Sequence, residues 1–129
     1  MEIRRVLESE LLSVLELLAT NGWRERIGSL EQFTALVKAS QLAEVAVLDD
    51  RVVGFVRAIT DGLSNGYLSM LVVAPEHRRN GIGRQLVQHA LGCNPQVSWV
   101  LRAGRYGAVE FFAKLGFEHS DCAMERRRQ

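Results

Sequence analysis

Glycines and arginines are concentrated in one short turn, Arg78-Arg79-Asn80-Gly81-Ile82-Gly83-Arg84, where an apolar run gives way to an amphipathic one. The first turn of a helix leaves backbone N–H groups without intrahelical partners, and the helix dipole adds partial positive charge at the same end. Gly81 and Gly83 have no Cβ, so the backbone can approach a ligand oxygen closely, and the arginines supply positive charge. These residue types in this order predict an anion site suited to phosphate.

The elements on either side of the turn can be predicted from hydrophobic pattern. Residues 68–73 are nearly all apolar, which is typical of a strand covered on both faces. After the turn, the apolar residues recur at helical spacing; they are Ile82, Leu86, Val87, Ala90 and Leu91. The Gly-x-Gly-x-x-Gly of dinucleotide sites and the Gly-Lys-Ser/Thr of P-loops are both absent. A plain strand–loop–helix connection, which also favours glycine, is the structural alternative.

Composition limits the classes of protein to consider. The 129 residues are 47% hydrophobic and 24% charged, which indicates a single globular domain spanning 1–129. The net charge of +1 gives no overall field toward nucleic acid or an anionic membrane, so neither is expected as a partner. Cys93 and Cys122 follow no metal or redox spacing, and no metal site is expected. Because no signal peptide or spanning segment is evident, we expect a cytoplasmic protein.

The order of elements predicts the fold class. The predicted strands are 1–7, 44–48, 52–59, 68–73, 97–102 and one near 123–126; the predicted helices are 9–20, one starting at Ser29, the glycine-turn helix and 107–115. Ser9 and the Ser29/Gln32 capping box mark two helix starts, and Asp49-Asp50 joins a hairpin. We therefore predict an α/β fold with a mixed, mostly antiparallel central sheet and helices on both faces. Trp23, among charges between two helices, could line a pocket or pack over helix ends.

Two motifs resemble one family. The spacing Arg/Gln-x-x-Gly-x-Gly/Ala, present from Arg78 to Gly83 after Val-Ala-Pro-Glu, resembles the acetyl-coenzyme A signature of the GCN5-related N-acetyltransferases. Residues 108–117, Ala-Val-Glu-Phe-Phe-Ala-Lys-Leu-Gly-Phe, are similar to the family's C-terminal helix, which ends in Leu-Gly-Phe. The element order extends the resemblance over nearly the whole chain. It implies the acyl-CoA N-acyltransferase fold and transfer of an acetyl group from acetyl-CoA to a primary amine of a small molecule or peptide.

The resemblance also implies a set of cofactor contacts. The central strand and the next parallel strand splay apart in this family, and the backbone of Leu71, Val72 and Val73 would hydrogen-bond the pantetheine arm. The backbone N–H of Leu71 would then stabilise the oxyanion of the tetrahedral intermediate. The remaining implied contacts are Arg78, Arg79, Asn80, Gly81, Ile82, Gly83 and Arg84 around the pyrophosphate, and Phe112 from the C-terminal helix.

The catalytic residues depart from the family pattern. Phe112 stands where many relatives have a proton-donating tyrosine, and Arg105 stands where an asparagine is common. Tyr106 is the substitute candidate for the acid, and Asp61 is the candidate for the base, although Asp61 with Gly62 could simply form a turn. A base for the amine should matter more than an acid for the departing thiolate. Deprotonating an amine of pKa about 10.4 at pH 7 costs roughly 4.6 kcal/mol, against about 2 kcal/mol for expelling a thiolate.

Some questions stay open at the level of the sequence. A non-catalytic acyl-CoA-binding or regulatory module of the same fold is the alternative to an enzyme, and the Phe112 departure is the feature that favours it. The acceptor amine is not encoded in any motif. A homodimer is a further expectation, because an exposed edge or C-terminal strand could pair two subunits.

Overall fold

The computed structural model describes residues 1–129, which form a five-stranded sheet in the order β1-β2-β3-β4-β5. The strands are β1 (Glu2–Arg5), β2 (Leu42–Leu48), β3 (Arg51–Thr60), β4 (Asn65–Val73) and β5 (Ser98–Leu101). β1 to β4 pair antiparallel, and β5 pairs parallel with β4. The predicted mixed, mostly antiparallel sheet is therefore confirmed.

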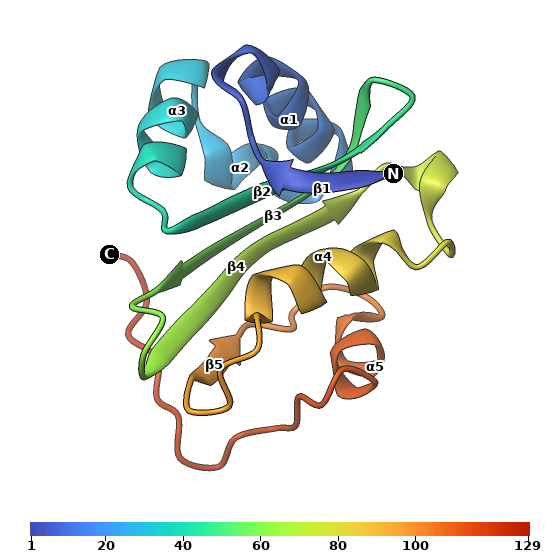
Figure 1. The fold of residues 1–129 in the computed structure, drawn as a ribbon. Coiled ribbons are helices and arrows are strands. Elements are labelled where there is room, and N and C mark those ends of the chain that lie inside the picture. Colours follow the sequence, from blue (N-terminus) through green and yellow to red (C-terminus); the bar gives the residue numbers. More distant parts are fainter.

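The helices cover both faces of this sheet, as Figure 1 shows. The α-helices are α1 (Leu11–Leu18), α2 (Arg24–Ile27), α3 (Leu30–Lys38), α4 (Ile82–Leu91) and α5 (Ala108–Ala113). Shorter helical turns are η1 (Glu8–Glu10), η2 (Ala19–Trp23) and η3 (Pro75–His77). α1, α2 and α3 pack on one face, and α4 and α5 pack on the other.

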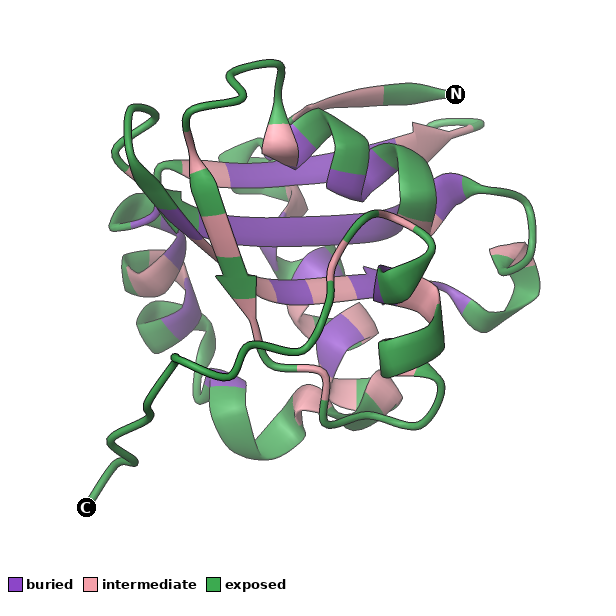
Figure 2. Ribbon diagram, turned by 90° about the horizontal axis from the view of Figure 1, so that it is seen from below, coloured by how far each residue is buried: buried purple, intermediate pink, exposed green.

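Each face has its own hydrophobic core. Phe33, Phe55, Leu18 and Val14 are fully buried beneath α1 and α3, whereas Leu86 and Val87 of α4 are fully buried against the other face. The middle strands are buried along most of their length, while the C-terminal tail is exposed throughout (Figure 2). The buried positions in α4 include the predicted residues Ile82, Leu86, Val87 and Ala90.

Local signals fixed two of the connections. The backbone N–H of Gln32 donates to Ser29 Oγ over 3.1 Å, and the N–H of Ser29 donates to Gln32 Oε1 over 2.8 Å, so the predicted capping box starts α3. Asp49 and Asp50 both have positive φ, at 51° and 61°. Positive φ at both central residues is what a tight two-residue hairpin turn requires.

Three predictions about the elements were wrong. Ser9 does not cap a helix: η1 precedes α1, and the carboxylate of Glu10 accepts the Leu7 N–H over 2.8 Å. The segment around Trp23, predicted as a connection between two helices, is itself helical, because η2 ends at Trp23 and α2 follows directly. No strand forms near 123–126, since the tail is mostly polar and charged and has no alternating apolar face to bury.

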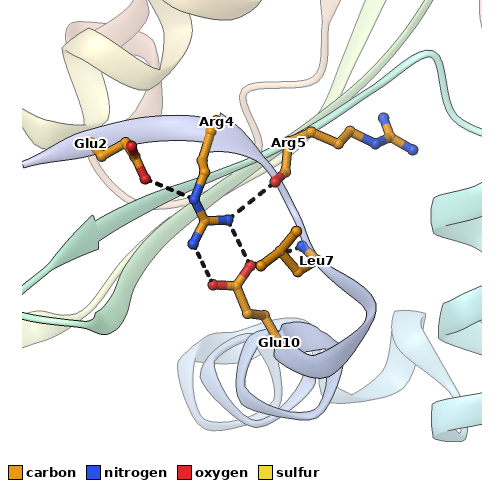
Figure 3. A network of polar contacts seen from close by, with 5 residues as sticks. All are labelled: Glu2, Arg4, Arg5, Leu7 and Glu10. Atoms are coloured by element: carbon orange, nitrogen blue, oxygen red, sulfur yellow. Dashed lines mark hydrogen bonds and ion pairs between the residues drawn. The ribbon is translucent and has the colours of Figure 1, made fainter.

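The N-terminal strand is tied to the first helical turn by a polar network (Figure 3). Arg4 donates two hydrogen bonds to the Glu10 carboxylate, at 2.9 and 2.8 Å, and a third to Glu2 at 2.8 Å. The hydrogen bonds from Arg4 hold the pKa of Glu10 below its usual range. This bidentate pair fixes η1 against β1 before the chain enters α1.

Candidate functional site

The second half of β4 has a free edge. β5 pairs with β4 only from Asn65 to Leu68, and β5 ends at Leu101. Beyond Leu68, β4 continues to Val73 while pairing with β3 alone. The last pair on this side is Gly54 of β3 with Val73 of β4. A strand that loses one neighbour exposes a row of unpaired N–H and C=O groups. An extended ligand with amide groups can therefore hydrogen-bond here in place of a strand.

A β-bulge in β4 lies just after the point where β4 and β5 stop pairing. Arg57 pairs with Met70 and Ala58 pairs with Leu68, so Ser69 has no partner residue in β3. The extra residue changes which side chains face which core. Leu68 packs with α4, whereas Met70 packs with the α1–α3 core. Bulges re-aim side chains and increase local twist, and the sequence contained no signal for this one.

The orientation of the free backbone groups follows from two contacts. The N–H of Ala74 donates to the carbonyl of Val53 in β3 over 2.8 Å. Backbone groups alternate in direction along an antiparallel strand, so those of Val72 and Met70 also face β3. The groups of Leu71 and Val73 face the open edge, and the Val73 carbonyl accepts Arg78 Nε over 3.0 Å. The N–H of Leu71, the predicted oxyanion donor, therefore faces the open edge.

The turn after β4 has the conformation of an anion-binding loop. Arg79 and Gly81 have left-handed φ values of 68° and 78°, and Gly81 is the N-cap of α4. The first hydrogen bond into α4 runs from the N–H of Gln85 to the Gly81 carbonyl over 3.0 Å, which leaves the amides before it free of intrahelical partners. Arg79 and Arg84 are exposed and form no ion pair. A diphosphate fits these donors and charges.

The helical turn η2, on the α1–α3 face of the sheet, contacts both loops that flank the open edge of β4. Arg78 Nη2 donates to Asn21 Oδ1 over 3.0 Å, and Arg105 Nη2 donates to the Gly22 carbonyl over 3.0 Å. The Arg105 guanidinium also lies 3.8 Å from the centre of the Trp23 ring. The turn η2 therefore connects the turn at residues 78–84, called here the glycine-arginine loop, to the loop between β5 and α5. The sequence contained no signal for these contacts of Asn21 and Gly22.

Comparisons with known proteins agree with this geometry. The sequence profile of the acetyltransferase (GNAT) domain matches residues 39–119. The chain is 30% identical to the peptidyl-lysine N-acetyltransferase YiaC of Escherichia coli, over 98% of this chain and 90% of that protein. This chain belongs to the GNAT family. It is an acetyltransferase enzyme of that family, which transfers acetyl groups to amines.

Further relatives support the same assignment. A peptidyl-lysine N-acetyltransferase of Salmonella typhimurium, YjaB, is 29% identical over 74% of this chain and 72% of that protein. A GNAT acetyltransferase structure from Streptococcus pneumoniae superimposes with a TM-score of 0.76 at 28% identity, covering 99% of this chain and 96% of that one. The predicted acyl-CoA N-acyltransferase fold is confirmed.

Asp61, the predicted base, closes the turn between β3 and β4 with its carboxylate. Its carboxylate accepts hydrogen bonds from the Ser64 hydroxyl at 2.6 Å and from the backbone N–H groups of Leu63, Ser64 and Asn65. The Ser64 hydroxyl and these amides hold the pKa of Asp61 well below its usual range, which makes it a weak base. It also lies beside Asn65, about 20 Å along β4 from Leu71.

The other catalytic candidates differ in environment. Tyr106 is fully exposed, and its hydroxyl makes no hydrogen bond to any other residue. Phe112 is buried and packs edge-to-face against Phe111 and Phe117, with ring centres 5.0 and 5.6 Å away. Phe112 contributes shape and apolar surface rather than a proton.

No His, Cys, Asp or Glu cluster could hold a metal ion, and no helix is long and apolar enough to cross a membrane.

Proposed function

We propose that this GNAT enzyme transfers the acetyl group of acetyl-CoA to the side-chain amine of a lysine in a peptide or protein. The observation that carries the proposal is the free edge of β4 directly beside the glycine-arginine loop. An arm with two amide groups fits the edge, and a diphosphate fits the loop, which together match one cofactor. The lysine acceptor rests on the relatives named as peptidyl-lysine N-acetyltransferases.

The roles of the residues follow from their orientation. The N–H and C=O groups of Leu71 and the N–H of Val73 would bind the amides of the pantetheine arm. The amides from Gly81 to Arg84 would bind the pyrophosphate, with Arg79 and Arg84 as counter-charges. The N–H of Leu71 would donate to the oxygen of the thioester carbonyl as negative charge develops there. Arg78 would keep its structural role, because its guanidinium is engaged by Val73 and Asn21.

The reaction needs little else from the protein. The lysine ammonium loses one proton, the neutral nitrogen bonds to the acetyl carbon, and the C–S bond breaks. The nitrogen then loses a second proton, and the thiolate takes up a proton and leaves as free CoA thiol. Water at the open cleft would take the protons from the amine, because Asp61, the predicted base, is distant. Tyr106 remains the candidate that would protonate the thiolate, and a Tyr106→Phe variant with unchanged kcat would exclude it.

The test is acetyl-CoA-dependent release of free thiol with a panel of lysine peptides, polyamines, amino acids, aryl amines and amino sugars. Release above the amine-free rate with lysine peptides supports the proposal. Release only with a small amine would contradict the peptide acceptor.

The cofactor site is tested by Gly81→Glu with Gly92→Glu as its matched control. Both glycines have positive φ and open space around the missing Cβ, so each substitution adds the same strain and the same charge. Because Gly92 ends α4 instead of starting it, only Gly81→Glu should weaken acetyl-CoA binding, by about 100-fold or more, since it places a carboxylate at the pyrophosphate. Equal affinities in the two variants would contradict the site.

A further inference from the structure

A basic pocket lies next to the candidate active site. It has a volume of about 640 Å³ and no hydrophobic lining residue. Its lining residues are Gly22, Arg24, Glu25, Arg26, Arg105 and Arg128. We call this the arginine pocket. Four guanidinium groups face a single carboxylate, so the pocket is strongly positive although the whole chain carries a charge of only +1.

The guanidinium groups of the arginine pocket lack counter-ions. Elsewhere in the chain Arg4, Arg102 and Arg127 each pair with a glutamate, whereas none of the four pocket arginines forms an ion pair. Burial, and after it repulsion by the nearby charge of Arg26, lower the pKa of Arg105. An anion entering this pocket would relieve that repulsion.

The arginine pocket is connected to the reaction centre by direct contacts. Arg105 lies in the loop between β5 and α5, and it contacts both Gly22 and Trp23 of η2. The neighbouring Asn21 is bonded to Arg78, which is itself bonded to the Val73 carbonyl at the free edge of β4. The arginine pocket therefore lies at α2, on the α1–α3 side of the sheet. The glycine-arginine loop has its own arginines, Arg79 and Arg84, at the start of α4 on the opposite face of the sheet.

We propose that the arginine pocket binds carboxylate side chains of the acceptor, so that this enzyme prefers lysines flanked by aspartate or glutamate. This inference rests on the proposed peptide acceptor. Guanidinium groups bind carboxylates with paired hydrogen bonds, and an exposed, apolar-free pocket suits a polar peptide better than an apolar side chain. Several carboxylates spaced along a peptide could reach Arg24, Arg26 and Arg105 together.

The inference is tested by binding of two labelled peptides in the presence of CoA. Both peptides contain one lysine, flanked by two glutamates on each side in the first and by two glutamines on each side in the second. We expect the wild-type protein to bind the glutamate peptide about 10-fold more tightly, and raising the salt concentration to reduce the difference.

Paired variants assign the preference to the pocket. Arg24→Gln/Arg26→Gln removes two exposed pocket charges, and Lys38→Gln/Arg51→Gln removes two exposed charges outside the pocket. The first double variant should bind both peptides equally, and the second should keep the wild-type preference. Equal binding of the two peptides by the wild-type protein, or a preference that survives in the first variant, would overturn the inference. So would loss of CoA affinity in the first variant, because the pocket would then serve the cofactor.

Kinetics separate this inference from the proposed function. If both peptides are acetylated, the pocket variant should raise KM for the glutamate peptide with little change in kcat, since the pocket is away from the reacting atoms. If neither peptide is acetylated, the peptide acceptor itself is contradicted. The binding preference and its loss in the pocket variant would still decide whether the pocket recognises carboxylates.

Discussion

The first 90 residues and the last 39 are packed very differently. Up to Ala90, buried residues fill both faces of β2, β3 and β4, whereas Phe112 is the only buried residue after Ala90. β5 pairs with β4 over four residues, and the tail beyond α5 has no regular structure. The N-terminal part therefore holds nearly all of the buried core, and the C-terminal part adds mostly half-buried side chains to its α4 side. Segments of low local contact are those most readily ordered by a ligand.

The largest expected difference between the two parts comes from matched core substitutions. Phe55 is fully buried under α1 and α3, whereas Phe117 is half-buried beside Phe112. Phe55→Ala should lower the free energy of unfolding by about 3–5 kcal/mol, because it leaves a cavity that rigid neighbours cannot fill. Phe117→Ala should cost roughly half as much, since part of its surface is already in water. Equal losses in urea denaturation would contradict the comparison.

A buried polar contact in the scaffold should have the next largest effect. Arg57 Nε donates to Ser40 Oγ over 2.7 Å inside the α1–α3 core, and burial lowers the pKa of Arg57. Ser40→Ala should cost about 1–3 kcal/mol, because a buried charged donor loses its acceptor. Ser98→Ala, at an exposed serine of β5 whose hydroxyl makes no hydrogen bond, is the control and should change stability little.

Combining Ser40→Ala with Arg57→Met sharpens this test. Replacing both partners by apolar groups removes the unsatisfied donor, so the double variant should recover part of the loss. A double variant whose loss equals the sum of the single losses would show that the two side chains are not coupled.

The smallest expected effect is pH-dependent. Because Arg4 lowers the pKa of Glu10 in the folded state, ionised Glu10 stabilises the fold above the pKa it has when unfolded, and this contribution disappears as the pH falls through the folded value. Glu10→Gln should therefore be less stable than the wild type at pH 7 and equal to it at about pH 2. Glu118→Gln, in the exposed tail, should match the wild type at both pH values. A constant difference across this range would contradict the ion pair.

Most of the scaffold could be predicted from the sequence because its signals are local. The capping box at Ser29, the hairpin turn at Asp49-Asp50 and the helical period of α4 each depend on residues within a few positions. The glycine-arginine loop was predicted for the same reason. The strand near 123–126 was mispredicted: Ala123 and Met124 are its only apolar residues, they are adjacent rather than alternating, and Met124 is exposed.

The parts of the site that the sequence missed depend on contacts between distant segments. The bulge at Ser69 is defined only by its pairing with β3, and the roles of Asn21 and Gly22 depend on Arg78 and Arg105, far along the chain. Asp61 was assigned as a base from proximity in sequence, but its carboxylate closes the loop between β3 and β4. Residue type suggested a base there, whereas the hydrogen bonds of the carboxylate hold it in a turn.

Amide hydrogen exchange, read residue by residue by NMR, tests acetyl-CoA binding along β4 most directly. The amides of Leu71 and Val73 face the open edge, while those of Met70 and Val72 are already bonded to β3. Saturating acetyl-CoA should slow exchange at Leu71 and Val73 by about 10-fold more than at Met70 and Val72. Equal slowing at all four amides, or none at Leu71 and Val73, would contradict a cofactor bound to the free edge of β4.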